Sequence, residues 1–159
     1  MAYFDYDRRT EPPLSNDCFT PVVNQPRPSV LVIEDGYSIT LPMQTICDFL
    51  DLDLETVSSY EDLGPILAER QPMAVIAEAD CEGQDGCHVL MTVAAYDPST
   101  PILLLTGEDP TVLGAVEAVQ ELWQLQTVIA SSSLPSVGKV VEFLFNAGLN
   151  ARCARFMPV

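Results

Sequence analysis

Short apolar runs alternate with longer amphipathic stretches through most of the chain. Each run is almost wholly apolar, which is typical of strands buried on both faces of a parallel sheet. The runs are Val30–Ile33, Ala74–Ala77, Ile102–Leu105 and Thr127–Ala130. A weaker run near Glu55–Ser58 predicts one further strand, the second in chain order. The pattern therefore indicates a sheet of five strands.

Helical periodicity occupies the stretches between these strands. Apolar residues recur at helical spacing from Ile39 to Leu50 and predict a first helix over 37–51, with Pro42 tolerated in its first turn. The other helices are predicted over 61–70, 88–96, 112–122 and 137–146, the last ending near Gly148. Such alternation favours an α/β fold that is doubly wound. We expect a flavodoxin-like five-stranded parallel sheet, with Ala74–Ala77 or its immediate neighbour at the centre.

The predicted domain spans residues 29–149 and is followed by a C-terminal tail over 150–159. Residues 1–28 contain five of the 13 prolines and no helical period. This composition predicts an extension that packs on the domain or stays mobile, with partner binding as the sharper alternative. Its aromatic residues are Tyr3, Phe4, Tyr6 and Phe19. These side chains are suited to cover an apolar patch of the domain.

Composition narrows the classes of partner. The formal net charge of −16 disfavours nucleic acid and anionic membranes, because both attract basic surfaces. No apolar run approaches the roughly 18 residues needed to span a bilayer, and the first residues lack the order of a signal peptide. We therefore expect a cytoplasmic protein. Its five cysteines, an odd number in a chain of this size, are expected to be reduced thiols.

Polar residues collect where the predicted strands end. In strand order they are Glu34 and Asp35, then Glu78, then Thr106, then Ser131, Ser132 and Ser133. The carboxyl ends of parallel strands share one edge of a sheet, and ligands bind at that edge in doubly wound folds. No glycine motif of the dinucleotide-binding or P-loop type follows any of these strands.

The order of segments and three local motifs resemble a response-regulator receiver domain. Val30–Asp35 resembles its first strand with the acidic pair that holds Mg²⁺. Residues 72–86 resemble its third strand and the following loop, which ends in Gly83-Gln84-Asp85-Gly86. Pro101–Thr106 resembles its fourth strand with a terminal hydroxyl. The resemblance implies that Glu34 and Asp35 form the acidic pair and that Thr106 contacts a phosphoryl group.

The chain departs from this family at two positions. The spacing from Gly86 places Glu78 where the family has its phosphoacceptor aspartate. Asp80 is the alternative, since its side chain lies on the same side of an extended strand, but it requires a loop two residues shorter. The lysine that ends the family's fifth strand is replaced by one of Ser131–Ser133, and the single lysine of the chain is Lys139, in the last predicted helix.

These departures predict a degenerate receiver. A phosphoryl dianion on a carboxylate depends on electrostatic compensation, and the missing lysine removes one positive charge. Glutamate displaces the nucleophile by about 1 Å, which costs on the order of 100-fold in rate. Without a nearby cation, Glu34, Asp35 and Glu78 are expected to share a proton or to bind a metal ion. No cofactor is required in this interpretation, although Mg²⁺ remains a possible ligand.

The loop after the third strand contains a second group of metal-binding residue types. Cys81, Cys87 and His88 lie near Asp80 and Asp85, which suggests a site for a soft metal. However, the spacing Cys-x5-Cys-His matches no common zinc motif, and zinc ligands usually include close cysteine pairs. We favour packed thiols, with His88 opening a helix.

Three aromatic residues near the end of the domain have two interpretations. Trp123, Phe143 and Phe145 fill helix seams, or they form an interaction surface where receivers contact partners.

The leading hypothesis is a single-domain pseudo-receiver that is not an enzyme and acts by protein–protein contact. Its partner would be a histidine kinase or another signalling protein, or a second copy in a homodimer, but neither nucleic acid nor a membrane. The first alternative is a phosphoacceptor that uses Asp80 or Glu78 with Mg²⁺ in a phosphorelay. The second is an unrelated flavodoxin-like ligand-binding protein.

Overall fold

The computed structural model describes residues 27–58, 61–81, 84–125 and 127–151. For Asp80, Cys81, Gln84 and Asp85 the description covers the backbone alone. The expectations for residues 1–26, including the four aromatic residues of the extension, therefore lie outside the described residues. So does most of the predicted C-terminal tail.

Five parallel strands form the main sheet in the order β2-β1-β3-β6-β7. The strands are β1 (Ser29–Ile33), β2 (Asp53–Val57), β3 (Ala74–Glu78), β6 (Ile102–Leu105) and β7 (Val128–Ser131). This order confirms the predicted flavodoxin-like sheet with Ala74–Ala77 in its central strand. β6 lies between β3 and β7, inside the sheet.

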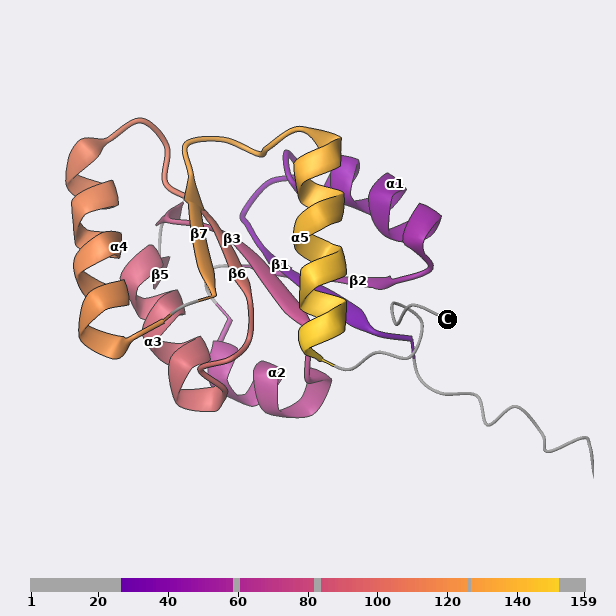
Figure 1. Cartoon of the computed structure of the whole chain (residues 1–159), viewed down its shortest axis with the longest axis horizontal. Coiled ribbons are helices and arrows are strands. Elements are labelled where there is room, and N and C mark those ends of the chain that lie inside the picture. The colour runs from indigo at the N-terminus through magenta and orange to yellow at the C-terminus, as the bar shows by residue number, and fades with distance from the viewer. Residues whose placement is uncertain (1–26, 59–60, 82–83, 126, 152–159) are drawn as a thin grey trace, which may run out of the picture.

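Five helices cover the two faces of this sheet. They are α1 (Thr40–Leu50), α2 (Leu63–Arg70), α3 (Gly86–Tyr96), α4 (Pro110–Trp123) and α5 (Val137–Asn150). Figure 1 shows α1 and α5 on one side of the sheet and α2, α3 and α4 on the other. In the described part of the chain, no helix has the length and apolar character needed to cross a bilayer.

The inner strands β1, β3 and β6 are almost wholly apolar because each of them serves two cores. In β1, Val30 and Val32 pack with α1 and α5, whereas Leu31 and Ile33 pack with the opposite layer of helices. The same alternation continues along β3 and β6. Side chains of successive strand residues point to opposite faces, so a sheet covered on both sides needs an unbroken apolar run.

Several predicted boundaries need correction. The first helix begins at Thr40, three residues later than expected, and the second strand runs from Asp53 to Val57 rather than from 55 to 58. The expected end of the last helix near Gly148 is wrong, since α5 continues to Asn150. Ala147 and Gly148 are both buried in that helix, so the small residues pack against the core and do not end it.

The loop after β3 contains a two-stranded antiparallel hairpin that the sequence did not predict. It pairs β4 (Asp80–Cys81) with β5 (Gln84–Asp85) and leads directly into α3 at Gly86. The backbone N–H of Gly86 donates to the carbonyl oxygen of Ala79 at 3.0 Å. A Cβ atom on Gly86 would lie only 2.8 Å from the Cβ of Ala79, so this close approach requires glycine.

Candidate functional site

A depression of about 430 Å³ lies at the carboxyl edge of the main sheet. It is lined by Ser38, Ile39, Glu78, Leu105, Gly107, Ser132, Ser133 and Leu134. These residues come from the β1–α1 loop, the ends of β3 and β6, and the β7–α5 loop. The depression therefore lies where doubly wound folds bind their ligands.

Glu34, the first residue after β1, is buried and turned toward the start of α1. Its Oε1 accepts hydrogen bonds from the backbone N–H of Thr40 at 2.8 Å and from the hydroxyl of Thr40 at 2.6 Å. Its Oε2 accepts from the backbone N–H of Ile39 at 2.9 Å and lies 3.3 Å from Oγ of Ser38. A carboxylate has about four acceptor positions, so three donors hold Glu34 and the Ser38 hydroxyl lies within reach of a fourth position.

This arrangement makes Glu34 the capping group of α1. The N-cap residue of the helix is Ile39, whose side chain makes no capping hydrogen bond. The first backbone N–H groups of a helix have no partner within it, and the N-terminus attracts negative charge. Glu34 satisfies two of these donors from outside the helix.

Glu78 ends β3 at the wall of the depression. Its Oε1 lies 3.3 Å from Oγ of Ser38, the same hydroxyl that lies 3.3 Å from Glu34. One hydroxyl donates one proton, so Ser38 serves only one of the two carboxylates at a time. The structure thus brings Glu34 and Glu78 to either side of the Ser38 hydroxyl. The side chain of Asp80 lies outside the described residues, so Asp80 stays an alternative prediction.

The expected cluster of three carboxylates does not form in the described part of the chain. No three histidine, cysteine, aspartate or glutamate side chains there are arranged to hold a metal ion. The reason is that Glu34 turns toward the helix rather than toward the depression. Mg²⁺ needs only one or two protein carboxylates, because it retains water molecules. Asp35, which is exposed in the same loop, and Glu78 are the residues that would hold it.

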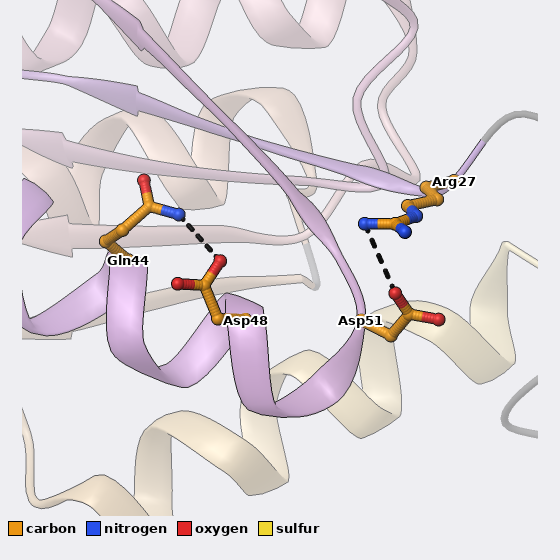
Figure 2. Close-up of polar contacts among 4 residues, drawn as sticks. All are labelled: Arg27, Gln44, Asp48 and Asp51. Carbon is orange, nitrogen blue, oxygen red and sulfur yellow. Dashed lines mark hydrogen bonds and ion pairs between the residues drawn. The ribbon is translucent and has the colours of Figure 1, made fainter.

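Basic side chains lie away from the depression in the described residues. Arg27 precedes β1 and pairs with Asp51 at the end of α1, at 3.3 Å, as Figure 2 shows. Arg70 ends α2 and pairs with Glu55 at 3.4 Å. Lys139 is exposed in the first turn of α5 and does not line the depression. None of the described residues that line the depression is basic.

The hydroxyl of Thr106 is turned toward the backbone rather than into open space. Thr106 is buried, and its Oγ1 lies 3.2 Å from the carbonyl oxygen of Gly107 and 3.4 Å from that of Ser131. Its backbone N–H donates to the same carbonyl of Ser131 at 2.8 Å. Thr106 thus joins the ends of β6 and β7. Its predicted role as a switch stays a prediction.

The three consecutive serines after Ala130 lie in different environments. Ser131 belongs to β7 and donates its hydroxyl to the carbonyl oxygen of Ser133 at 2.7 Å, whereas Ser132 and Ser133 are exposed and line the depression. Sequence reasoning missed Leu134, which lines the depression and also packs on the core beneath α1 and α5. Its apolar character within a polar loop was the available signal.

The three aromatic residues do not share one surface. Phe143 is buried in the core between α1 and α5, so its assignment to an interaction surface is wrong. Trp123 at the end of α4 and Phe145 on α5 are partly exposed, at 44% and 41%.

The thiol chemistry near the hairpin is limited in the described residues. Cys47 is buried and Cys87 is half-buried, and both are free thiols. His88 is exposed at the start of α3. The proposed soft-metal set involves side chains of the hairpin that lie outside the described residues, so it stays a prediction.

Comparison of the sequence finds neither a matching family model nor a matching curated protein. Comparison of the structure finds receiver domains. The signal receiver domain of an HD domain-containing protein from Pseudomonas fluorescens matches with a TM-score of 0.64 and 22% identity, covering 81% of this chain and 92% of that one. A receiver domain protein from Clostridium thermocellum matches with a TM-score of 0.62 and 19% identity, covering 80% and 98%.

The apo receiver domain of nitrogen regulatory protein C gives similar values. Its TM-score is 0.61 at 21% identity, with 80% of this chain and 98% of that domain covered. Nearly the whole of each receiver domain is thus matched by the part of this chain that forms the sheet and its helices. The chain therefore has the flavodoxin-like fold that receiver domains have.

Proposed function

We propose that this chain is an atypical receiver-like signalling protein that acts by protein–protein contact, with little or no phosphorylation and without catalysis of its own. The observation that carries the proposal is the wall of the depression at the carboxyl edge. Among the described residues that line it are Glu78 and three serines, together with apolar side chains and Gly107, and none of these lining residues is basic.

Electrostatics supports this proposal. Phosphoryl transfer to a carboxylate gathers negative charge in a small volume, and enzymes and receivers offset that charge with lysine, arginine or metal ions. Here Glu34 accepts three hydrogen bonds at the start of α1, and the Ser38 hydroxyl lies within reach of it. Arg27 and Arg70 are paired elsewhere. None of the described residues that line the depression would add a positive charge beside a phosphoryl group there.

The phosphoacceptor alternative draws on one observation. Glu78 lies beside Leu105 in the sheet register, directly before Thr106, so a carboxylate and a hydroxyl end neighbouring strands. Such a pair suits a phosphoryl group on an acidic side chain only if a cation joins it. Asp35 and Glu78 would hold Mg²⁺ in that case, and Mg²⁺ would supply the charge that the wall lacks.

Labelling with a small phosphodonor separates the two functions. We expect the full chain, incubated with Mg²⁺ and acetyl phosphate, to gain no phosphoryl group by intact-mass measurement. Stoichiometric labelling that depends on Mg²⁺ would overturn the proposal and favour the phosphoacceptor. Peptide mapping would then distinguish Glu78 from Asp80.

A set of double variants tests the missing charge itself. Glu78→Asp combined with Ser132→Lys, Ser133→Lys or Leu134→Lys places an acceptor and a cation in the same wall. We expect labelling to rise in at least one of the three. Glu78→Asp with Ser136→Lys is the matched control, because Ser136 is exposed in the same loop but does not line the depression. Equal labelling in control and test variants would show that missing charge in the wall is not the cause.

A further inference from the structure

Helix α1 exposes large apolar side chains along its outer side. Leu41 is 68% exposed and Phe49 is 84% exposed. Tyr37, in the turn before the helix, is 72% exposed, and its carbonyl oxygen accepts from the backbone N–H of Leu41 at 3.1 Å. These three residues are exposed away from the side of α1 that packs on the sheet, with Tyr37 in the turn before the helix, Leu41 in its first turn and Phe49 in its last. We call them the α1 outer stripe.

The stripe is not a by-product of core packing. The inner side of α1 is formed by Met43, Ile46 and Cys47, which are buried against the sheet and α5. Single exposed apolar residues are common on protein surfaces, but a row of large ones marks a contact surface. The exposure of Phe49 exceeds that of the other large apolar residues in the described part of the chain.

The segment that precedes the described residues enters the domain beside this stripe. Arg27 contacts Asp51, the residue at which α1 ends, through the 3.3 Å ion pair in Figure 2. Phe49 lies two residues before Asp51. Figure 1 likewise shows the start of β1 close to the far end of α1. Arg27, the first described residue, is therefore held at the end of α1 that carries Phe49.

We propose that residues 1–26 of this chain cover the α1 outer stripe, with the aromatic side chains of the segment in contact with Leu41 and Phe49. The segment supplies Tyr3, Phe4, Tyr6 and Phe19. Its prolines favour an extended polyproline II conformation, which loses little entropy on docking. This inference goes beyond the proposed function, since it concerns a different face of the molecule.

The lengths fit. Helix α1 has 11 residues and is about 16 Å long. An extended chain advances about 3.1 Å per residue, so the stretch from Phe19 to Arg27 spans up to about 25 Å. Phe19 can therefore reach any point of the stripe, and the earlier aromatic residues can return along it.

Charge and tethering favour this occupant over a second copy. Two chains that each carry a net charge of −16 repel one another, which opposes a dimer through this face. A segment of the same chain meets the stripe at an effective concentration in the millimolar range, because a short linker holds it nearby.

Photocrosslinking in the full chain tests the contact directly. We expect Phe49→p-benzoylphenylalanine to form an intramolecular crosslink to a residue within 1–26, located by peptide mass spectrometry. Leu122→p-benzoylphenylalanine is the control, because Leu122 is 79% exposed on α4, in the opposite layer of helices. Crosslinks between two chains only, or none to residues 1–26, would overturn the proposal.

Proteolysis of the full chain provides an independent measurement. Phe49→Asp should accelerate tryptic cleavage after Arg9 about tenfold, which corresponds to about 1.4 kcal/mol of docking free energy. Leu122→Asp should leave that rate unchanged. Equal rates in the native chain and in Phe49→Asp would contradict the docked segment, since both variants replace exposed residues and keep the core intact.

Discussion

The buried carboxylate of Glu34 organises the loop between β1 and α1. It accepts two backbone N–H groups of the helix start as well as the hydroxyl of Thr40. Such a residue contributes to stability as a capping group does, because it satisfies donors that would otherwise be buried without a partner. Its position in the acidic pair is therefore structural in this chain.

We predict that Glu34→Ala lowers the free energy of unfolding by about 2 kcal/mol, since the cap is lost and two donors are left without their acceptor. Glu34→Gln should cost less, because its amide oxygen still accepts hydrogen bonds. Chemical denaturation measures both. The control is Glu108→Gln at an exposed position, which should change stability little. An effect of Glu34→Ala no larger than the control would contradict the capping role.

Titration of the Cys47 thiol is expected to lower the stability of the protein at alkaline pH. Burial, and then the charge of Asp48, raise the pKa of the Cys47 thiol from 9.0 to about 11. The unfolded chain releases this proton first, so stability is fully present below pH 9 and declines as the pH rises toward 11. By pH 11 this loss of unfolding free energy amounts to about 2 kcal/mol.

We predict that the unfolding free energy depends on pH with a different slope in the native chain and in Cys47→Ala. The variant should be less stable at neutral pH because of the cavity, yet its unfolding free energy should fall less steeply between pH 9 and 11. Denaturant titrations across that range measure both slopes. Parallel profiles would show that Cys47 does not titrate differently in the two states.

At the scale of elements, two glycines differ in the space around them: Gly86 is closely packed, whereas Gly114 is not. Gly86 joins β5 to α3, and an added Cβ would lie 2.8 Å from Ala79 Cβ and 3.3 Å from a methyl group of Leu104. Gly114 lies inside α4, and an added Cβ would meet nothing within 4 Å. Close approach requires glycine at the first position alone.

Alanine at these two positions should therefore change the stability of the protein in opposite directions. Gly86→Ala should destabilise the protein by about 1–3 kcal/mol, because the hairpin must shift away from α3. Gly114→Ala should stabilise it by about 0.5–1 kcal/mol, because alanine restricts the unfolded chain and favours the helix. Thermal unfolding of the two variants measures the contrast. Changes of the same sign would refute the packing described for the hairpin.

At the scale of the whole molecule, the net charge of −16 lowers the stability of the folded state. The chain carries 23 acidic and seven basic lysine or arginine residues. Two of those basic residues form ion pairs at the described surface, and neither lines the carboxyl edge. Repulsion among the remaining carboxylates opposes the compact state.

We predict that sodium chloride raises the melting temperature. The Debye length shortens from about 10 Å at 0.1 M to about 3 Å at 1 M, so repulsion between exposed carboxylates is screened. Chloride is preferable to sulfate in this test, because sulfate also strengthens apolar burial. A melting temperature that falls or stays constant would indicate that the carboxylates are already compensated locally.

Much of this architecture was determined by the sequence alone. The strand at Val30–Ile33 and its counterparts read as unbroken apolar runs because a sheet covered on both faces leaves no polar position. The alternation with helices then set the fold class and placed β3 at the centre. The gathering of Glu34 and Glu78 at one edge followed from parallel strands, whose carboxyl ends meet there.

Tertiary structure decided which way those side chains point and what surrounds them. Glu34 turns to α1 because Ile39 cannot cap the helix, and Leu134 enters the wall because the β7–α5 loop folds over the core. Phe143 is buried in a core cluster that residues of β1 and α1, far earlier in the chain, help to form. Local periodicity reports which residues share a face of an element. Which distant elements meet at that face depends on packing among all of them, and only the folded structure shows it.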